Sequence, residues 1–103
     1  MPDASWKAFE RRIARLFPNG RRRGANTRGD SARKSDIVCD GWSPECKLLG
    51  RPAFSDLLDA ARQAERNAQG HQIPVAIVKR KRDRDTDALA VMRLKSFQEW
   101  FLC

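Results

Sequence analysis

The sequence predicts a single α/β domain in which a mixed central sheet of about four to five strands is flanked by helices, in the order αβββαββα. Three observations carry this prediction: apolar residues at helical spacing near the N-terminus and again after residue 54, a continuous apolar run at 75–78, and short β-rich segments around them. The chain has 103 residues, enough for one hydrophobic core but not for two. Residues 1–103 are therefore expected to form one domain.

The N-terminal part predicts a helix followed by a basic loop. Over residues 3–17 the apolar side chains recur at helical spacing: Trp6, Phe9, Ile13, Leu16 and Phe17. Pro18-Asn19-Gly20 supplies the stop. Residues 20–35, GRRRGANTRGDSARKS, contain almost nothing apolar, so they predict a basic loop with one short strand at most, suited to an anionic partner.

The remaining elements follow from turn residues and apolar runs. Residues 36–40 and 45–49 predict two short strands of a hairpin, joined at 41–44. Ser55 is expected to cap a helix that Gly70 ends, with an apolar face made of Leu57, Leu58, Ala61, Ala64 and Ala68. Residues 75–78 are typical of a strand covered on both faces, 88–94 of a further strand, and Ser96 of the cap of a last helix at 97–102.

The charge balance is strongly basic. Lys and Arg number 21 against 13 Asp and Glu, which gives a formal charge of +8 and a pI near 10.3. Such an excess favours an anionic partner, and nucleic acid is the first candidate. A membrane surface is the competing explanation, but no run approaches the roughly 20 apolar residues of a spanning helix, and the N-terminus lacks a signal-peptide profile. A cytoplasmic protein is expected.

The cysteines and the single histidine are assigned no role. Cys39, Cys46 and Cys103 are odd in number and lack metal-binding spacing, so reduced thiols are expected. His71 follows Gly70 in a loop and is expected at the surface.

The predicted hairpin brings together residues that carry chemistry. Residues two apart in a strand share a face, so Glu45 and Lys47 point the same way. With the turn at Trp42-Ser43, one face carries Asp36, Asp40, Glu45 and Lys47, and the other the apolar set Ile37, Cys39, Cys46 and Leu48. Mg2+ or Mn2+ would relieve the repulsion among the three carboxylates, and we take Asp36 and Glu45 as the metal ligands.

The charged strand face and Glu10 each have an alternative interpretation. Mixed charges on an exposed strand face are common, but the Asp nine residues before Glu45, the helix that follows and the basic context favour a functional face. Glu10 lies beside the apolar stripe of the first helix. It is either a group of the metal site or a boundary residue whose carboxylate pairs with an Arg, and helix geometry alone favours the pairing.

Two basic segments bracket these residues in the sequence. The first contributes Arg21, Arg22, Arg23, Arg28, Arg33 and Lys34, and the second Lys79, Arg80, Lys81, Arg82 and Arg84. Both are expected to hold phosphates without base specificity, the alternative being loops that only keep the protein soluble. Trp42 and Trp100-Phe101-Leu102 suggest self-association or wedging into branched DNA, although burial in the core is the stronger expectation for Trp100. A homodimer would present two active sites to two strands.

These features together resemble the PD-(D/E)XK nuclease superfamily, and within it the small Holliday-junction resolvase-like endonucleases. The resemblance covers most of the chain: a helix bearing Glu10, the segment GANTRGDSARKSDIV, the pair Asp36 and Glu45-Cys46-Lys47, the following helix, and the strand IPVAIVKRKR. Two departures are Ser35, where Pro is usual before the Asp, and strands that are short for the family.

The resemblance implies a restriction-endonuclease-like core in which Asp36 and Glu45 bind Mg2+. It implies that Lys47 positions the attacking water or steadies the transition state, and that Glu10 completes the acidic cluster. Gln63 or Gln69 is a further candidate, matching a Gln that some families of the superfamily use near the metal; Gln63 falls off the apolar face of its helix.

The function expected from the sequence is an Mg2+- or Mn2+-dependent endodeoxyribonuclease that selects DNA by structure. A Holliday junction or other branched DNA is the expected substrate, in the cytoplasm of a bacterial, archaeal or phage-infected cell. The alternative is a non-catalytic nucleic-acid-binding protein on the same fold, which would bind without cleaving. RNA binding fits the pI equally well, but three acidic residues on one face would repel RNA in the absence of metal.

Overall fold

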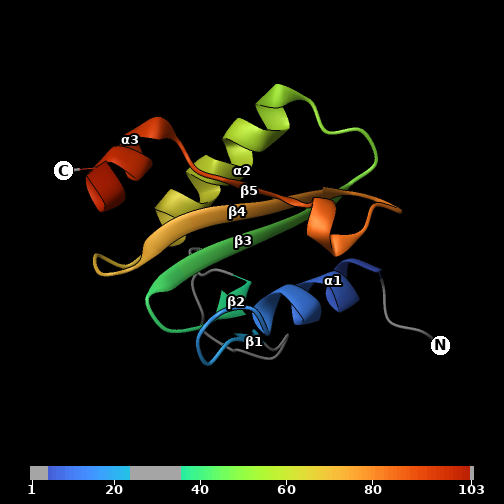
Figure 1. Ribbon diagram of the computed structural model, residues 1–103, viewed down its shortest axis with the longest axis horizontal. Coiled ribbons are helices and arrows are strands. Elements are labelled where there is room, and N and C mark those ends of the chain that lie inside the picture. Colours follow the sequence, from blue (N-terminus) through green and yellow to red (C-terminus); the bar gives the residue numbers. More distant parts are fainter. Residues whose placement is uncertain (1–4, 24–35, 103) are drawn as a thin grey trace.

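The computed structural model describes residues 5–23 and 36–102, and within them the helices and strands follow the expected order. They are α1 (Ser5–Ala14), β1 (Arg21–Arg22), β2 (Ile37–Val38), β3 (Trp42–Leu49), α2 (Phe54–Asn67), β4 (Ile73–Arg80), the 3-10 turn η1 (Asp85–Asp87), β5 (Leu89–Val91), α3 (Leu94–Phe97) and the π-helical turn η2 (Gln98–Leu102). Helices α2 and α3 lie on one side of the long strands, and α1 with β1 and β2 lies on the other (Figure 1).

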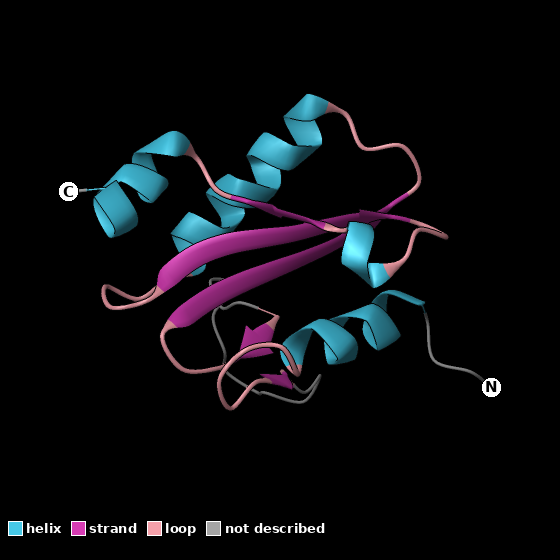
Figure 2. Ribbon diagram, viewed as in Figure 1, coloured by secondary structure: helices cyan, strands magenta, loops and turns pink. Residues whose placement is uncertain are grey.

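The strands form two sheets. In the larger one β4 is central, parallel to β3 and antiparallel to β5, and the smaller one is the antiparallel pair β1–β2. Figure 2 shows β3 and β4 running side by side across the molecule. Both are longer than the sequence predicts: β3 includes residues 42–44, which were expected in the turn, and β4 extends past the expected 75–78 at both ends. This mixed α/β arrangement leaves β3 at an edge of its sheet.

The expected hairpin between 36–40 and 45–49 is wrong. Strand β2 pairs with β1, with Arg22 opposite Ile37, whereas β3 pairs with β4. The chain turns earlier than predicted, at Gly41, whose φ of +80° is a conformation that glycine adopts at little cost. Pro44 is accommodated inside β3 because an edge strand tolerates a residue that cannot donate to the ladder.

Helix α1 covers β2 and β3 from one side. A buried cluster joins Phe9 and Ile13 of α1 to Ile37, Cys39 and Cys46, with Leu48 packed against it. The apolar face expected from the alternation of residues 37–39 and 46–48 is therefore confirmed, although the pairing that suggested it is not.

The expected stripe of α1 is only partly buried. Leu16 is 77% exposed because the helix ends at Ala14, before the stripe reaches it. Trp6 is 49% exposed, and its ring carries the guanidinium of Arg22 at 5.3 Å. The chain then folds back at Gly20, where a Cβ atom would overlap the carbonyl oxygen of Ala14.

Helix α2 lies on the opposite side of the sheet. Its cap is Ala53 and not Ser55: the carboxylate of Asp56 accepts a hydrogen bond of 2.8 Å from the backbone N–H of Ala53. The buried face consists of small or short residues, namely Ala60, Ala61, Ala64 and Asn67. Such residues let the helix axis approach β3 and β4 closely.

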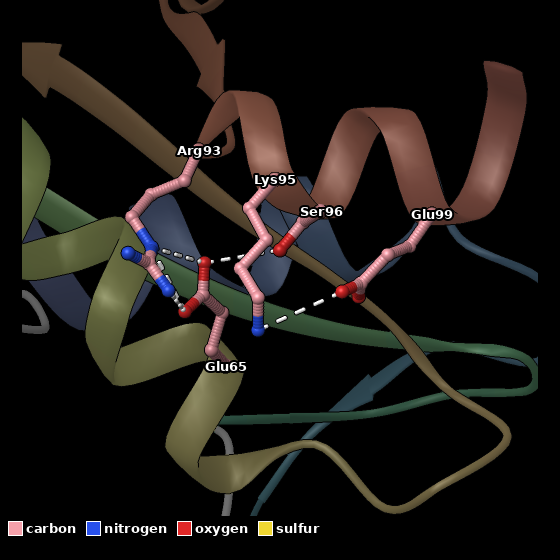
Figure 3. Close-up of polar contacts among 5 residues, drawn as sticks. All are labelled: Glu65, Arg93, Lys95, Ser96 and Glu99. Carbon is pink, nitrogen blue, oxygen red and sulfur yellow. Dashed lines mark hydrogen bonds and ion pairs between the residues drawn. The ribbon is translucent and has the colours of Figure 1, made fainter.

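The C-terminal helix is anchored to α2 by Glu65 (Figure 3). The Arg93 guanidinium donates to both carboxylate oxygens of Glu65, at 2.7 and 2.8 Å, and Ser96 donates to Oε2 at 3.0 Å. These hydrogen bonds, led by that from Arg93, lower the pKa of Glu65. Ser96 therefore lies inside α3 as an anchor, whereas the sequence predicts it as a cap. Trp100 is 37% exposed, so its expected burial in the core is wrong.

Asp85 ties α1 to the end of β4. Its carboxylate accepts hydrogen bonds from Arg12 at 2.6 Å and from the buried amine of Lys79 at 2.8 Å. The hydrogen bond from Arg12, followed by that from Lys79, outweighs partial burial and lowers the pKa of Asp85 to about 2. Because the ordinary value is 3.8, this stabilisation is present above pH 3.8 and is lost as the pH falls towards 2.

Asp85→Asn is expected to lower the free energy of unfolding by about 2 kcal/mol at pH 7, since it leaves the buried Lys79 amine without its carboxylate. Urea unfolding at pH 7 and pH 2.5 measures this, and the difference from wild type should shrink at pH 2.5. Asp59→Asn, at an exposed position of α2, is the control. An equal loss in both variants would contradict the role given to Asp85.

In the described residues, no helix combines the length and the apolar character that crossing a bilayer would require.

Candidate active site

Four of the residues singled out in the sequence gather at the outer edge of β3. Glu45 and Lys47 come from β3, Asp36 directly precedes β2, and Glu10 comes from α1. Glu10, Asp36 and Lys47 line one cavity of about 300 Å3, together with Trp6, Phe9 and Leu48 among others. The charge of Asp36 acts on both Glu10 and Glu45. These residues therefore meet at the edge of the sheet, whereas the sequence predicts that they meet on one face of a hairpin.

Glu45 is fully buried, which is costly for an ionised group. Its Oε1 accepts a hydrogen bond of 2.9 Å from the side-chain amide of Asn67, whereas its Oε2, equally buried, has no hydrogen-bond partner in the described part of the chain. Burial, followed by the charge of Asp36, raises the pKa of Glu45 to about 7, against the lowering effects of Asn67 and Lys47. The carboxylate lacks enough positive charge around it.

Glu10 is buried and held by an arginine. Arg22 donates from Nε to Glu10 Oε1 at 2.7 Å, across the join between α1 and β1. Burial raises the pKa of Glu10, the hydrogen bond from Arg22 opposes that rise, and the charge of Asp36 adds to it. The arginine pairing that helix geometry favours is thus present, and the same carboxylate also lies within the field of Asp36.

Lys47 is half-buried and lines the cavity, and strand alternation puts it on the same face of β3 as Glu45. Across residues 5–23 and 36–102, its amine makes no hydrogen bond or ion pair, although its charge lowers the pKa of Glu45. An ammonium group in this position is available to a ligand bound in the cavity.

Asp40 is not part of this group, which corrects the expected four-residue face. Its side chain is exposed and accepts a hydrogen bond of 2.6 Å from Asn19. Its backbone N–H donates to Pro18 at 2.9 Å, so Asp40 fastens the turn that follows α1. The physical reason is the early turn at Gly41, which places Asp40 before β3 and not opposite Glu45.

Asn67 is the residue that sequence reasoning missed. The amide predicted near the metal was Gln63 or Gln69; the amide that contacts Glu45 comes instead from Asn67, one turn after the half-buried Gln63. A signal was present in the sequence, because Asn67 continues the spacing of Ala60 and Ala64 on the buried stripe of α2. A polar side chain in such a stripe needs a partner.

The basic residues have different environments. Arg21 is exposed, Arg22 binds Glu10, and Arg23 is half-buried with its backbone N–H donating to the backbone oxygen of Asp36 at 2.8 Å.

In the second basic segment, Lys79 is buried against Asp85 and the ring of Phe9. The expectation that it contacts phosphates is therefore wrong, because its amine lies inside the fold. Exposed Arg80 pairs with Asp83, and Lys81 is exposed. Arg28, Arg33 and Lys34 lie outside the described residues.

Cys39 and Cys46 are free thiols buried in the α1 cluster, and burial is the first cause that raises the pKa of each. His71 is exposed, as expected. Cys103 lies outside the described residues.

The side chains fit a divalent cation in one specific respect. Within the described ranges, no group of three or more His, Cys, Asp or Glu side chains is arranged to hold a metal ion. Mg2+ in enzymes is, however, often held by one or two carboxylates and completed by water and substrate phosphates. Asp36 and Glu45 are such a pair of carboxylates, and Oε2 of Glu45 has no hydrogen-bond partner among the described residues. Carboxylate oxygens are the ligands that a hard cation such as Mg2+ prefers.

Comparison of the chain with protein-family models, with curated proteins and with solved structures gave no match in any of the three.

Proposed function

We propose that the protein is an Mg2+- or Mn2+-dependent endodeoxyribonuclease with a restriction-endonuclease-like core, and that Asp36, Glu45 and Lys47 form its active site. The observation that carries the proposal is Glu45. A fully buried carboxylate with one oxygen lacking a donor, beside a second carboxylate, is unfavourable in its ionised form unless a proton or a metal cation balances it. A divalent ion that also binds a substrate phosphate provides that balance.

The chain's own residues supply the other requirements of phosphodiester hydrolysis. When bound, the metal ion supplies Lewis acidity and activates water. Lys47, which lines the cavity together with Asp36, orients the attacking water or offsets the negative charge that grows on the phosphate oxygens. Glu10 completes the acidic cluster from the side of α1, held in place by Arg22.

A basic groove supports DNA as the substrate. A second cavity, of about 440 Å3, lies between α1 and the turn after β4, and Leu48 borders both cavities. Its basic lining residues include Lys81 and Arg82, with Asp83 beside them; Lys79 and Arg12 also border it, but both are paired with Asp85. Arg82 has a φ of +75°, which is costly for a residue other than glycine and is often kept where a side chain has a functional position. Exposed Lys81 and Arg82 are proposed to bind phosphates next to the scissile one.

Lys81→Ala with Arg82→Ala is expected to weaken DNA binding about 10-fold and to reduce the slope of log affinity against log salt by about 2, since roughly one counterion is released per phosphate contact. Fluorescence anisotropy in EDTA over a range of NaCl concentrations measures both. Arg62→Ala with Arg66→Ala removes the same charge from exposed positions on α2 and should leave the slope unchanged. If only the α2 control variant had a smaller salt-dependence slope, DNA would bind along α2 and not in this groove.

A second copy of the chain is the partner we propose for the face around α3. The groove beside α2 is lined by Phe54, Leu57 and Val91, and Phe97, Phe101 and Leu102 project next to it, at 41–61% exposure. Phe54 at 79% and Leu94 at 67% are exposed as well, and large apolar side chains that gather on one exposed face favour a protein partner. The pairs Arg93–Glu65 and Lys95–Glu99 keep this face electrically balanced (Figure 3).

Light scattering at about 50 μM tests the dimer, a concentration at which a standard interface is expected to be occupied. Wild type should have twice the chain mass, and Leu94→Glu should have the mass of one chain. Leu16→Glu, at a more exposed leucine beyond α1, should remain dimeric. A monomeric wild type would exclude this partner.

The experiment that tests the nuclease is cleavage of labelled four-way junction, flap and linear duplex DNA with Mg2+, Mn2+ or EDTA. The proposal expects metal-dependent cleavage, strongest on a branched substrate, and its loss in Lys47→Ala. Salt-sensitive binding without cleavage of any substrate would instead identify a DNA-binding protein on this fold.

A further inference from the structure

The contact between Asn67 and Glu45 is the buried polar link between α2 and the candidate active site. The Asn67 amide donates to Glu45 Oε1 at 2.9 Å, and the two residues are 7% and 0% exposed. Within the described part of the chain, Asn67 is the one hydrogen-bond donor to this carboxylate. Burying an amide at this place is unfavourable without a matching acceptor, so the pair constrains both side chains.

This hydrogen bond makes the two oxygens of Glu45 different. Oε1 is occupied by the amide, whereas Oε2 is buried without a donor and is the oxygen left for another ligand. Ser43, two residues earlier on the same face of β3, cannot substitute, because its hydroxyl donates to the backbone oxygen of Ala64 at 3.3 Å. The rotation of the Glu45 carboxylate is therefore set by one side chain on another element.

The position of Asn67 is in turn set by the end of α2. Asn67 is the last residue of the helix, and the backbone N–H of Ala68 closes the final turn on the oxygen of Glu65. Ala60 and Ala64 hold this part of the helix close to the sheet, so that a short amide side chain spans the gap to β3. A site on one edge of the sheet thus depends on a helix that contributes no charged group to it.

We propose that Asn67 is a positioning residue that holds Glu45 Oε1 and presents Oε2, beside Asp36, to a divalent cation. The inference rests on the proposed metal-dependent function and adds a residue that acts through Glu45. Hydrogen bonds of this kind to a ligating carboxylate typically change metal affinity by about 10- to 100-fold.

Mn2+ binding to the metal-free, DNA-free protein tests it, with the free ion followed by electron paramagnetic resonance. Asn67→Ala and the similarly shaped Asn67→Leu should each weaken Mn2+ binding by about 10-fold or more. The Mn2+ concentration for half-maximal cleavage should rise in parallel, with the rate at saturating metal largely retained. Ser43→Ala is the matched control: it removes a buried hydrogen bond from the same α2–β3 interface without touching Glu45, and Mn2+ affinity should stay at the wild-type value.

The outcomes separate this inference from the function on which it rests. Unchanged Mn2+ affinity in both Asn67 variants, with wild type binding Mn2+ and cleaving DNA, would overturn the positioning role and leave the nuclease standing. Equal weakening in Ser43→Ala would also overturn it, since helix packing would then explain the effect. No Mn2+ binding and no cleavage by wild type would remove the proposed function itself, and the positioning role with it.

Discussion

Glu45→Gln is expected to reduce metal-dependent cleavage on the order of 1,000-fold while leaving DNA binding in EDTA unchanged. The substitution keeps the shape of the side chain but removes the charge that the proposed cation requires. It also removes a buried carboxylate oxygen that has no donor, next to Asp36. The metal-free protein should therefore become more stable, by about 1–2 kcal/mol. Single-turnover cleavage and urea unfolding in EDTA measure the two effects.

The opposite signs of these effects make the test specific. A residue needed only for folding would lose activity and stability together, whereas a ligand kept at a cost loses activity and gains stability. Glu99→Gln provides the control, because Glu99 is exposed beyond α3 and pairs with Lys95 at 3.6 Å. Cleavage by Glu45→Gln at the wild-type rate would remove Glu45 from the site.

Local patterns explain why much of this arrangement was predictable. The alternation of residues along β3 places Glu45 and Lys47 on one face and Cys46 on the other, whatever the strand pairs with. The same alternation accounts for the burial of Cys39 and Cys46 together with Ile37. The order of helices and strands follows from periodicity and turn residues, which are also local.

The pairing partner of a strand depends on the whole chain, and the strand pairing predicted from local sequence is wrong. A hairpin between 36–40 and 45–49 is the nearest partner choice, but β3 pairs with β4, which lies beyond a helix. That choice alone moves Asp40 out of the site and into the turn after α1. Lys79 was misassigned for a similar reason, because its partners Asp85 and Phe9 come from separate elements that only folding brings together.

The hydrogen-bond partner of Asn67 could not be predicted from the sequence. Its place on the buried stripe of α2 is readable from the sequence, but its acceptor is not, since any polar group on the covered strands would satisfy it. The contact with Glu45 needs the register of α2 on β3, which the small side chains of the helix determine in three dimensions.

Asp36→Asn and Asp40→Asn are expected to have very different effects on the cleavage rate, although both residues lie in one short segment of sequence. Asp36 lines the cavity with Lys47 and acts on Glu45, so its loss should reduce cleavage by about 100-fold or more. Asp40 is exposed and bound to Asn19, so its loss should change cleavage by less than about twofold. Single-turnover cleavage of the best DNA substrate at saturating Mg2+ is the measurement.

The two variants also test the geometry of the edge of β3. If β2 and β3 formed the hairpin predicted from sequence, Asp40 would face Glu45 and both variants would lose activity. With the turn at Gly41, Asp36 alone reaches the buried carboxylate, and raising the Mn2+ concentration should partly restore Asp36→Asn, because Glu45 and Lys47 remain in place. Loss of cleavage in Asp40→Asn but not in Asp36→Asn would move the metal pair to the turn and overturn the site described above.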